Sequence, residues 1–541
     1  MTVKTDVEVT QIYRILRFTL PIWSVLIILA VWGGFVHLDA SSLWLDELFT
    51  VYLSDPAQPT FSAFLSRASE DVHPPGYYAL VWAAAQLMGG KLPDIARGIS
   101  AASGALSIVL IYFSMPSWVS RPARLFSCSV AANSIVYFVY TQEARSYALS
   151  WVLTALLVIV ASSIIHAAAR RNSLSWLLLL FVIVGIIASL IHLYLITIVG
   201  AMVIIMLYFG GNLGNRISIA ISGSAVLAAT LVFLEWHAGR IVADISDTWF
   251  QSDFDFLWQH TRIGIGALIG STLEESLATI LLAASLVAAA WMWTKRYAIE
   301  NLEQAFVDIT LLLGSAVVGI AIAILVTIFY TPSYSYRYFL VLAPFYWIAM
   351  GLLFELVLRS SLRWLIIGIV LFSTMTFGFL SVRLVWRDVP TKQPWRETAE
   401  FVETIQECRD AILPVVTLPD AYITGSEPAN FYGYYLRNGH TRNWLSYSAN
   451  HVTTFPGTGP AKDIVAQRVM GIDPCPILLW NVNHSNLTSL ETARTSLLQN
   501  FDLPEDKTII LKTITLPESN IYMRLLGMSL QEGGHFLLIQ G

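Results

Sequence analysis

Apolar runs long enough to cross a membrane constrain this chain more than any other feature. A spanning helix needs about 20 mostly apolar residues, and eleven such runs follow one another along the 541 residues. They cover residues 18–38, 97–116, 123–140, 146–168, 174–190, 192–210, 217–235, 276–294, 305–329, 337–358 and 362–382. Charged residues make up 13% of the chain, whereas soluble domains carry roughly 25%. The sequence therefore predicts a polytopic α-helical membrane protein with about 11–13 transmembrane helices.

The charge of the connections between these runs predicts the orientation of the chain. Lysine and arginine concentrate on the cytoplasmic side of membrane proteins. If the N-terminus lies inside, every second connection carries the basic residues, namely Arg121, Arg124, Arg170, Arg171, Arg216, Lys295, Arg296, Arg359 and Arg363. We expect a multi-pass protein of the cytoplasmic (inner) membrane whose tail, from Arg383 onward, lies on the periplasmic or extracellular side.

The remaining connections carry acidic, histidine, tyrosine and other polar residues, and all of them fall on the outer side. They hold the pair Asp46-Glu47 and the segments 73–78, 141–147, 191–194, 271–276 and 331–338. Polar residues scattered without a function would occur on both sides. We therefore expect one outward-facing site that is walled by the ends of several helices.

Three further segments do not count as spans. Residues 76–89 are expected to form a re-entrant or interfacial helix, because counting them as a span would break the alternation of charge. The same expectation applies to residues 257–270. In residues 56–70 the apolar side chains recur at helical spacing, which predicts a helix on the membrane surface.

The composition changes after the last apolar run, which predicts two domains. Residues 1–389 form a transmembrane domain whose first outer loop, 39–75, carries the acidic pair, and residues 390–541 form an extracytoplasmic α/β domain. In the second domain, "TKQPWRETAEFVETIQE" predicts an amphipathic helix, and "AILPVVTL", "CPILLWNV", "KTIILKTITL" and "HFLLIQG" predict strands. An outward location would permit a disulfide between Cys408 and Cys475, a pairing that the sequence leaves open.

The acidic pair lies in an apolar surround, between Trp44 and Leu48. A carboxylate near lipid is desolvated, which makes it a better proton acceptor near neutral pH. One carboxylate of the pair is therefore a candidate general base, and the other is a candidate for orienting a substrate hydroxyl or binding a cation. The structural alternative is that the pair caps a helix, because acidic residues favour helix N-termini.

Histidines in two outer connections are candidates for substrate binding. Two prolines follow His73, so "HPPGYY" predicts a sharp turn at which His73 contacts a phosphate or carries a proton. His192 and Tyr194, in "IHLY", are further candidates. A solvated helix start explains Glu274 and Glu275 equally well.

Arginines at the ends of two spans are candidates for binding an anion. Arg145, in "QEARSY", lies beside lipid, where an unpartnered arginine costs roughly 2.5–3.5 kcal/mol, so its partner is either Glu143 or a bound phosphate. Arg337, in "TPSYSYRY", suits bidentate phosphate binding. Its neighbours Tyr336 and Tyr338 would face the same way in an extended segment, as in a sugar-stacking surface or an interfacial belt.

Taken together, these motifs resemble the polytopic GT-C glycosyltransferases. The resemblance is strongest to the protein mannosyltransferases and lipid A aminoarabinose transferases, glycosyltransferase family 39 with its bacterial relatives. The matching motifs are "LDE" after the first helix, then "HPPGYY", "QEARSYAL", "SYRYFLVLAP" and "KQPWRETAEFV". Each motif is short, but their order and their shared side make the set specific. The resemblance covers most of residues 15–400.

The resemblance implies an enzyme that takes a sugar from a polyprenyl-phosphate donor. It would pass the sugar to a lipid, glycan or protein acceptor outside the membrane. The resemblance implies Asp46 as the general base, Glu47 as a residue that orients the acceptor or the base, and His73 at a phosphate-contacting position where some relatives carry lysine. Charge adds Arg145 and Arg337 as ligands of the donor phosphate.

Nothing in the sequence indicates a nucleotide-sugar donor or a nucleic-acid partner. The chain lacks a glycine-rich strand–turn–helix signature, and its net charge is −5. It carries one acidic pair and no further acidic cluster of convincing spacing. We therefore expect no metal and no other cofactor, a divalent metal being the less favoured alternative.

Three other functions fit a chain with outward polar clusters. A glycan polymerase or ligase would use a lipid-diphosphate-linked oligosaccharide, but would carry a large outer loop between its late helices. A flippase or transporter of lipid-linked sugars would have polar residues near the middle of the membrane and broken helices in two matching halves, which the runs lack. A non-catalytic glycan-binding membrane protein would keep its function without the acidic pair.

Overall fold

A computed structural model of the protein describes residues 3–36, 38–69, 71, 73–245, 251–269, 302–358, 367–375, 377–378, 395–406, 413–418, 434–437, 444–448, 477–481, 509–514 and 536–540. Several predicted features lie outside the described residues. These are the run 276–294, Glu274, Glu275, Lys295, Arg296, Arg359, Arg363, Arg383, Cys408 and Cys475.

The chain divides into two compact units, and each is described by itself. The first consists of Met1–Leu38 with Pro56–Arg387, and the second of Asp39–Asp55 with Asp388–Gly541. The residues predicted as one outer loop, 39–75, are thus divided between the two units. The predicted domains themselves stay a proposal.

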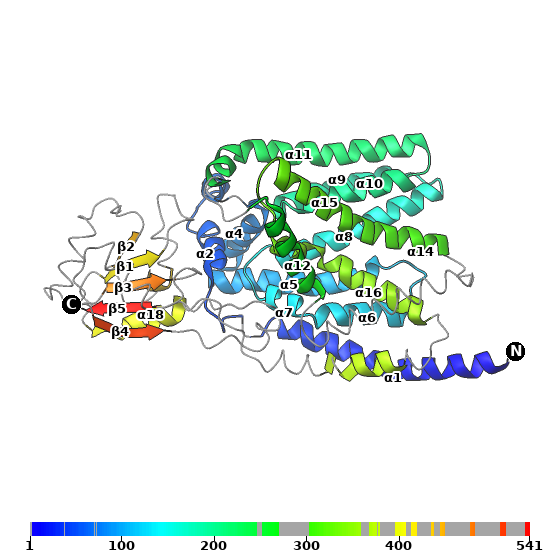
Figure 1. The fold of residues 1–541 in the computed structure, drawn as a ribbon, viewed down its shortest axis with the longest axis horizontal. Helices are drawn as coiled ribbons and strands as arrows, with labels where there is room; N and C mark the ends of the chain where they lie inside the picture. The colour runs from blue at the N-terminus through cyan, green and yellow to red at the C-terminus, as the bar shows by residue number, and fades with distance from the viewer. Residues whose placement is uncertain are drawn as a thin grey trace. The chain divides into compact units, whose positions relative to one another are not determined.

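The first unit is a bundle of helices (Figure 1). Its helices are α1 (Val3–Gly33), α3 (Phe61–Ala68), α4 (Gly76–Met88), α5 (Leu92–Ser114), α6 (Arg121–Ala132), α7 (Ile135–Thr141), α8 (Tyr147–Ala169), α9 (Ser175–Ile191), α10 (Leu195–Phe209), α11 (Leu213–Ile245), α12 (Phe254–Ile269), α14 (Leu302–Ile309), α15 (Ser315–Phe329) and α16 (Ala343–Leu358). A π-helical turn, Thr310–Gly314, joins α14 to α15, and a 3₁₀ turn, Tyr336–Leu342, leads into α16. Figure 1 shows α8, α9, α10, α11 and α15 extending in a common direction.

Several helices of this bundle have the length and composition of membrane spans. Among the described residues, five segments are long and apolar enough to cross a membrane, namely Leu92–Ser114, Tyr147–Ala169, Leu213–Glu235, Gln304–Phe329 and Tyr336–Leu358. Large apolar side chains stay exposed on these segments, for example Phe113 at 66% and Val232 at 72%, as expected for surfaces that face lipid. The prediction of a polytopic α-helical membrane protein is confirmed, whereas the number of eleven to thirteen spans stays a prediction.

The segments not counted as spans form shorter helices. Helix α4 has 13 residues and α12 has 16 residues, fewer than the about 20 that a span needs. Two glycines with positive φ, Gly89 at 64° and Gly90 at 100°, follow α4. Glycine adopts this conformation without a steric penalty, so the chain can turn sharply there.

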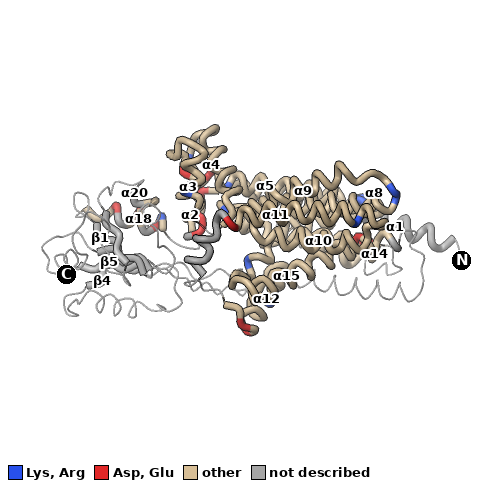
Figure 2. Tube along the Cα trace, turned by 90° about the horizontal axis from the view of Figure 1, so that it is seen from above, with Lys and Arg blue, Asp and Glu red and all other residues tan. Residues whose placement is uncertain are grey.

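Charged residues lie mainly near the ends of the bundle helices, and the middles are largely uncharged (Figure 2). At one end, buried Asp308 accepts a hydrogen bond from Trp118 Nε1 at 3.0 Å and contacts His166 Nε2 at 3.0 Å. The basic connections 121–124 and 170–171 adjoin these residues in the chain. Tyr147 begins α8, which places it roughly 30 Å along the helix from His166. The bundle therefore has a basic end and, opposite it, the end that carries Tyr147.

One predicted span is broken in the structure. The sequence predicts a single span over residues 123–140, but α6 and α7 occupy that range. Helix α6 ends at Asn133, and Ser134 Oγ then accepts a hydrogen bond from the Tyr137 N–H at 3.2 Å. Serine and asparagine favour helix ends, because their side chains bond to free backbone groups. The prediction of one continuous helix is wrong here for this reason.

Tryptophans join the helices in the core of the bundle. Trp23 of α1 is fully buried, lies 5.7 Å from Phe126 between ring centroids, and donates a hydrogen bond to Thr374 Oγ1 at 2.8 Å. Trp151 of α8 donates to the Leu340 carbonyl oxygen at 2.8 Å. Buried indoles need such acceptors for their N–H groups. These bonds connect α1 and α8 to the C-terminal part of the bundle.

The second unit contains a five-stranded sheet with the strand order β2-β1-β3-β5-β4. Its strands are β1 (Leu413–Leu418), β2 (Trp444–Ser448), β3 (Ile477–Asn481), β4 (Ile509–Ile514) and β5 (Phe536–Gln540). β1 pairs in parallel with β2 and β3, and β5 pairs antiparallel with β3 and β4. Every strand except β2 coincides with a run from which the sequence predicts a strand. The prediction of an α/β domain is confirmed.

Among the described residues, three helices belong to the same unit as the sheet. They are α2 (Leu45–Leu53), α18 (Trp395–Glu403) and α20 (Tyr434–Arg437). Helix α18 lies within the segment predicted as an amphipathic helix. Helix α2 carries the acidic pair and comes from the first connection of the chain.

Glycine at position 76 allows α4 to begin against the end of α9. A Cβ atom there would lie 2.5 Å from the Leu190 carbonyl oxygen and 2.9 Å from Ile191 Cδ1. The carbonyl oxygen belongs to the α9 backbone and cannot move away without disturbing that helix. The glycine of "HPPGYY" therefore determines how closely α4 approaches the turn that carries His192.

We expect Gly76→Ala to lower the free energy of unfolding by about 1–3 kcal/mol, the usual cost of forcing extra atoms into a packed contact. Thermal unfolding of the purified protein in detergent, followed by tryptophan fluorescence, measures the change. Gly98→Ala in α5 is the matched control, because a Cβ at that position has nothing within 4 Å and alanine favours a helix. An unchanged melting temperature for Gly76→Ala would contradict the close approach of α4 and α9.

Candidate functional site

Polar side chains from four turns meet at the end of the bundle that carries Tyr147. The turns lie before α4, between α7 and α8, between α9 and α10, and before α16. They supply five predicted site residues, namely His73, Arg145, His192, Tyr194 and Tyr338. The structure brings these side chains together, and the roles predicted for them stay proposals.

Asp71, His73, Tyr78 and Arg145 form a closed ring of polar contacts, here called the arginine ring. Asp71 Oδ1 lies 3.0 Å from His73 Nδ1, and His73 Nε2 lies 3.3 Å from Arg145 Nη2. Arg145 Nη1 donates to the Tyr78 hydroxyl at 3.0 Å, and that hydroxyl donates to Asp71 Oδ2 at 2.7 Å. The ring holds the guanidinium in one orientation, because two of its nitrogens contact side chains of the segment 71–78, namely His73 and Tyr78.

The arginine ring contains an ionised carboxylate. Burial by itself would raise the pKa of Asp71. The charge and hydrogen bond of His73, the charge of Arg145 and the hydrogen bond from Tyr78 together hold the pKa of Asp71 well below its usual value. Asp71 therefore offsets the positive charge of Arg145, a residue that is only 5% exposed.

The two ring nitrogens of His73 face different partners. Nδ1 faces the carboxylate of Asp71, and Nε2 faces the guanidinium of Arg145. His73 is also the most accessible of the three charged or titratable members, with 39% of its side chain exposed against 10% for Asp71. A ligand would therefore meet the arginine ring at His73.

His192 lies beside the arginine ring in an aromatic wall. Its ring centroid is 5.8 Å from Tyr147 and 5.5 Å from Tyr338, and Tyr338 stacks on Tyr194 at 3.7 Å. Burial, followed by the nearby charges of His73 and Arg145, lowers the pKa of His192 to about 3. Its Nδ1 is buried and has no hydrogen-bond partner among the residues that the structure describes. His192 is thus a neutral imidazole with a bonding position that a ligand can use.

Tyr336 and Arg337 are half-buried at the start of the 3₁₀ turn. The Arg337 Cζ lies 6.0 Å from the centroid of the Tyr336 ring, and the Tyr336 N–H donates to His260 Nδ1 at 3.3 Å. Tyr334 is instead buried, with its hydroxyl 2.7 Å from Thr261 Oγ1. The extended arrangement considered for these tyrosines is therefore wrong, because a 3₁₀ turn begins at Tyr336.

Glu143 is buried in the turn before Arg145. Its carbonyl oxygen accepts a hydrogen bond from the Arg145 N–H at 2.8 Å. The adjacent Gln142 donates to the carbonyl oxygens of Gly33 and Val36 at 3.1 and 2.9 Å. These bonds hold the turn against the end of α1, so the backbone that carries Arg145 is anchored at a second point.

Asp46 and Glu47 lie in the first turn of α2, in the second unit. Glu47 is buried, and its Oε2 accepts a hydrogen bond from the Trp44 N–H at 3.3 Å. Glu47 thus fills the capping role that was the structural alternative for the pair. Asp46 is half-buried, and its carbonyl oxygen accepts from Thr50 Oγ1 at 3.2 Å. The two neighbouring acids therefore differ in role, and Asp46 is the better candidate for a base.

Sequence reasoning did not single out Asp71, Tyr78 or Arg396. Asp71 precedes His73 by two positions, and Tyr78 lies in "HPPGYY", so their closeness in sequence could have indicated both as neighbours of His73. Arg396 lies in "KQPWRETAEFV", but its partner Ser42 is 354 residues away. No local pattern in the sequence predicts a contact over such a separation.

Within the described part of the chain, no group of three or more His, Cys, Asp or Glu side chains is arranged to hold a metal ion. Asp71 with His73 is one carboxylate and one imidazole, fewer groups than a metal site in a protein usually provides. The expectation of a reaction without a metal stays a prediction.

Comparisons with known proteins find a likeness in structure and none in sequence. No protein-family model matches the chain, and no curated protein matches it. The crystal structure of ArnT from Cupriavidus metallidurans bound to undecaprenyl phosphate matches with a TM-score of 0.51 and 13% identity, over 96% of this chain and 97% of that chain. The apo state of the same protein matches with a TM-score of 0.41 and 14% identity, over 96% and 97%.

A third solved structure is the archaeal oligosaccharyltransferase AglB from Archaeoglobus fulgidus in complex with an inhibitory peptide and a dolichol-phosphate. It matches with a TM-score of 0.42 and 10% identity, over 86% of this chain and 69% of that chain. Identities this low carry no residue-level argument, so the likeness is one of fold. The chain therefore shares its overall fold with the ArnT structure.

Proposed function

We propose that this protein transfers a sugar, with inversion, from a polyprenyl-phosphate donor to a lipid, glycan or protein acceptor at the outer face of the cytoplasmic membrane. The observation that carries the proposal is the arginine ring at the end of an apolar bundle. A buried arginine held by fixed partners suits a phosphate, and the apolar outer surface of the helices suits a polyprenyl chain. The fold shared with an ArnT structure that binds undecaprenyl phosphate supports the same class of donor.

The donor phosphate would bind at Arg145 and His73. Charge-assisted hydrogen bonds from arginine to phosphate are short and strong, and the accessible edge of the arginine ring is at His73. Arg337 supplies a second cation for the same group. His192, a neutral imidazole, would hydrogen-bond the phosphate or a sugar hydroxyl. Tyr194, Tyr336 and Tyr338 would provide aromatic faces for the sugar.

The ionised Asp71 explains how the site can exist without its ligand. A buried arginine without a partner is costly, because its charge loses solvation. Asp71 offsets that charge and is linked to Arg145 through His73 and Tyr78.

In the proposed reaction, Asp46 acts as the general base. It removes the proton from the acceptor hydroxyl while that oxygen forms a bond to the anomeric carbon. The bond between the anomeric carbon and the phosphate oxygen breaks, and the electron pair leaves with the polyprenyl phosphate. The leaving phosphate needs no proton, so one base is sufficient, and the cations stabilise the charge that develops on the leaving group. No step requires a metal.

Glu47 has a supporting role in this proposal. The hydrogen bond from the Trp44 N–H to Glu47 stabilises the first turn of α2. It thereby holds the backbone from which Asp46 extends. Glu47 would orient the base through the helix rather than by contacting the acceptor. Glu143 would act in the same indirect way through the turn that carries Arg145.

The basic end of the bundle supports the proposed orientation. Arg121, Arg124, Arg170 and Arg171 lie in connections at the end opposite the arginine ring, and such residues favour the cytoplasm. The arginine ring would then face outward. The α/β domain, which follows the last predicted span, would lie outside as well.

We expect the C-terminus to be outside the cytoplasm. A phosphatase that folds only outside the cytoplasm should be active when it is fused after Gly541, and a fluorescent protein that matures only inside should be dark there. The same two reporters inserted at Asn172, in the connection between α8 and α9, are the matched control and should give the opposite result. An inactive phosphatase at Gly541, together with a fluorescent reporter there, would contradict the orientation.

Asp46→Asn should lower kcat by about 10²–10⁴-fold, because it removes general-base catalysis, and should leave donor affinity unchanged. The measurement is transfer by the purified protein from a radiolabelled single-sugar polyprenyl phosphate. Asp55→Asn, at the other end of α2, is the matched control. Full activity of Asp46→Asn would remove Asp46 from the role of base.

Three measurements on the purified protein separate the competing functions. Transfer from a diphosphate-linked oligosaccharide, and not from the single-sugar donor, would favour a polymerase or ligase. Movement of a labelled lipid-linked sugar across vesicles, unaffected by Asp46→Asn, would favour a flippase or transporter. Binding of glycans that persists without Asp46 and Glu47, with no transfer, would favour a non-catalytic binding protein.

Arg145→Lys should raise the donor KM by roughly 10–100-fold, because an ammonium keeps the charge but not the two-nitrogen fork, and hydrogen bonds to charged groups contribute about 1.5–3 kcal/mol. Arg124→Lys is the matched control. Arg124 donates to the carbonyl oxygens of Val119, Tyr112 and Pro116 at the basic end, so this variant should lose stability but keep its donor KM. An equal KM for Arg145→Lys and wild type would contradict the phosphate role.

A further inference from the structure

The segment that carries the acidic pair is held by the C-terminal part of the chain. Residues Asp39–Asp55 belong to the same compact unit as Asp388–Gly541. Contacts between Ser42 and Arg396 join positions that are 354 residues apart in sequence. The structure thus assigns the connection after the first span to the α/β domain.

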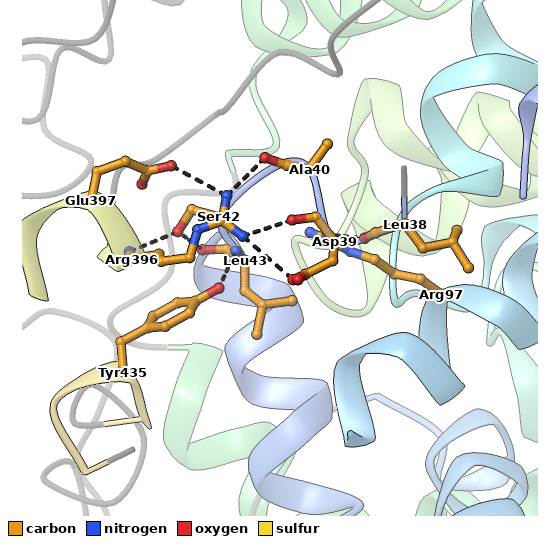
Figure 3. A network of polar contacts seen from close by, with 9 residues as sticks. All are labelled: Leu38, Asp39, Ala40, Ser42, Leu43, Arg97, Arg396, Glu397 and Tyr435. Atoms are coloured by element: carbon orange, nitrogen blue, oxygen red, sulfur yellow. Dashed lines mark hydrogen bonds and ion pairs between the residues drawn. The ribbon is translucent and has the colours of Figure 1, made fainter. Parts of the chain in front are cut away.

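Two side chains from this domain bind consecutive backbone groups of the connection (Figure 3). Arg396 Nη1 donates to the Asp39 carbonyl oxygen at 2.6 Å, and Arg396 Nη2 donates to the Ala40 carbonyl oxygen at 2.7 Å. The Arg396 backbone N–H donates to Ser42 Oγ at 3.0 Å. The Tyr435 hydroxyl accepts a hydrogen bond from the Leu43 N–H at 2.8 Å. We call residues Arg396 and Tyr435, with these contacts, the backbone clamp.

The backbone clamp bonds both buried and accessible groups of the connection, whose residues 39–44 form no helix or strand of their own. Ser42 is 2% exposed and Leu43 is 1% exposed, whereas Asp39 is exposed and Ala40 is half-buried. A buried N–H without a partner costs about 1–3 kcal/mol, so the bond that the Leu43 N–H donates to the clamp offsets such a cost. The planar guanidinium of Arg396 matches two neighbouring carbonyl oxygens, which fixes their direction as well as their position.

The clamped residues lead directly into the helix that carries the acids. Leu43 is followed by Trp44, whose N–H is capped by Glu47, and α2 begins at Leu45. Asp46 lies three positions after the last clamped residue. A helical turn is stiff, so the place of Leu43 determines the place of the Asp46 Cα to within a small range.

We propose that Arg396 and Tyr435 are positioning residues for Asp46. They hold Asp39–Leu43, and through the first turn of α2 they set where the Asp46 carboxylate is presented. The α/β domain is thus a structural part of the catalytic machinery. This inference rests on the proposed function, in which Asp46 is the general base. A displacement of about 1 Å in a catalytic group can lower a rate by about 10²-fold.

The test uses the full-length protein in detergent with the variants Arg396→Ala, Arg396→Lys and Tyr435→Phe. Hydrogen–deuterium exchange over residues 39–47 reports the clamp, and kcat with the donor KM reports catalysis. We expect exchange to accelerate by about tenfold or more in Arg396→Ala and in Tyr435→Phe, since each removes hydrogen bonds to this segment. We expect kcat to fall by about 10–100-fold with the donor KM unchanged within about twofold.

Arg396→Lys should recover part of the kcat, because an ammonium can donate to one of the two carbonyl oxygens. Glu400→Gln is the matched control: Glu400 is an exposed residue of α18, and its replacement should change neither measurement. Protection of β1 and β3 from exchange shows that the sheet is intact. If Arg396→Ala loses the exchange protection of the sheet, the inference is tested with Tyr435→Phe alone, because that variant removes only one hydroxyl group.

Two results would overturn the inference. Unchanged exchange over residues 39–47 in both Arg396→Ala and Tyr435→Phe would show that no clamp holds the segment. Accelerated exchange with an unchanged kcat would show that the clamp does not position the base. A wild type that transfers no sugar would instead overturn the proposed function, and exchange alone would then decide whether the clamp exists.

Discussion

The cost of burying charge among apolar helices governs where this protein can carry polar groups. At one end of the bundle, buried Arg145 has hydrogen-bond partners in His73 and Tyr78, and both of these contact Asp71. At the other end, Asp308 is buried beside tryptophan and histidine donors. Between these ends, the described parts of the helices carry few charged side chains (Figure 2). A candidate site in such a protein therefore forms at helix ends, where turns bring side chains from several segments within reach of each other.

The acidic pair takes part in contacts of another kind, namely hydrogen bonds that involve backbone groups. Glu47 caps the helix that carries Asp46, and the residues before that helix bond to Arg396 and Tyr435. The two adjacent acids thus differ in environment: Glu47 is buried and caps the helix, whereas Asp46 is half-buried. The C-terminal unit thus supplies hydrogen-bond partners to a short irregular segment, among them an acceptor for the N–H of buried Leu43.

The sequence predicts the secondary structure of most single segments. Apolar length predicts the helices of the bundle, and alternation bounded by proline and asparagine predicts four of the five strands. Prediction from these patterns failed where a local preference competes with the general pattern. The break near Ser134 depends on one side chain that caps a helix, and the arrangement of Tyr336 and Tyr338 depends on a 3₁₀ turn that begins at Tyr336. Neither effect changes the hydropathy of its segment, so a pattern of apolar residues cannot reveal it.

By itself, the sequence determined that the chain is a helical membrane protein with an appended α/β domain, and that His73, Arg145 and His192 belong to connections on one side. Those properties depend on the local spacing of apolar, basic and turn-forming residues. Only the tertiary structure decided that Asp71 balances Arg145, that Glu47 serves as a cap, and that the acidic segment belongs to the C-terminal unit. The physical reason is that hydrogen bonds and ion pairs depend on atoms meeting in space, and residues hundreds of positions apart leave no periodic trace of their meeting in the chain.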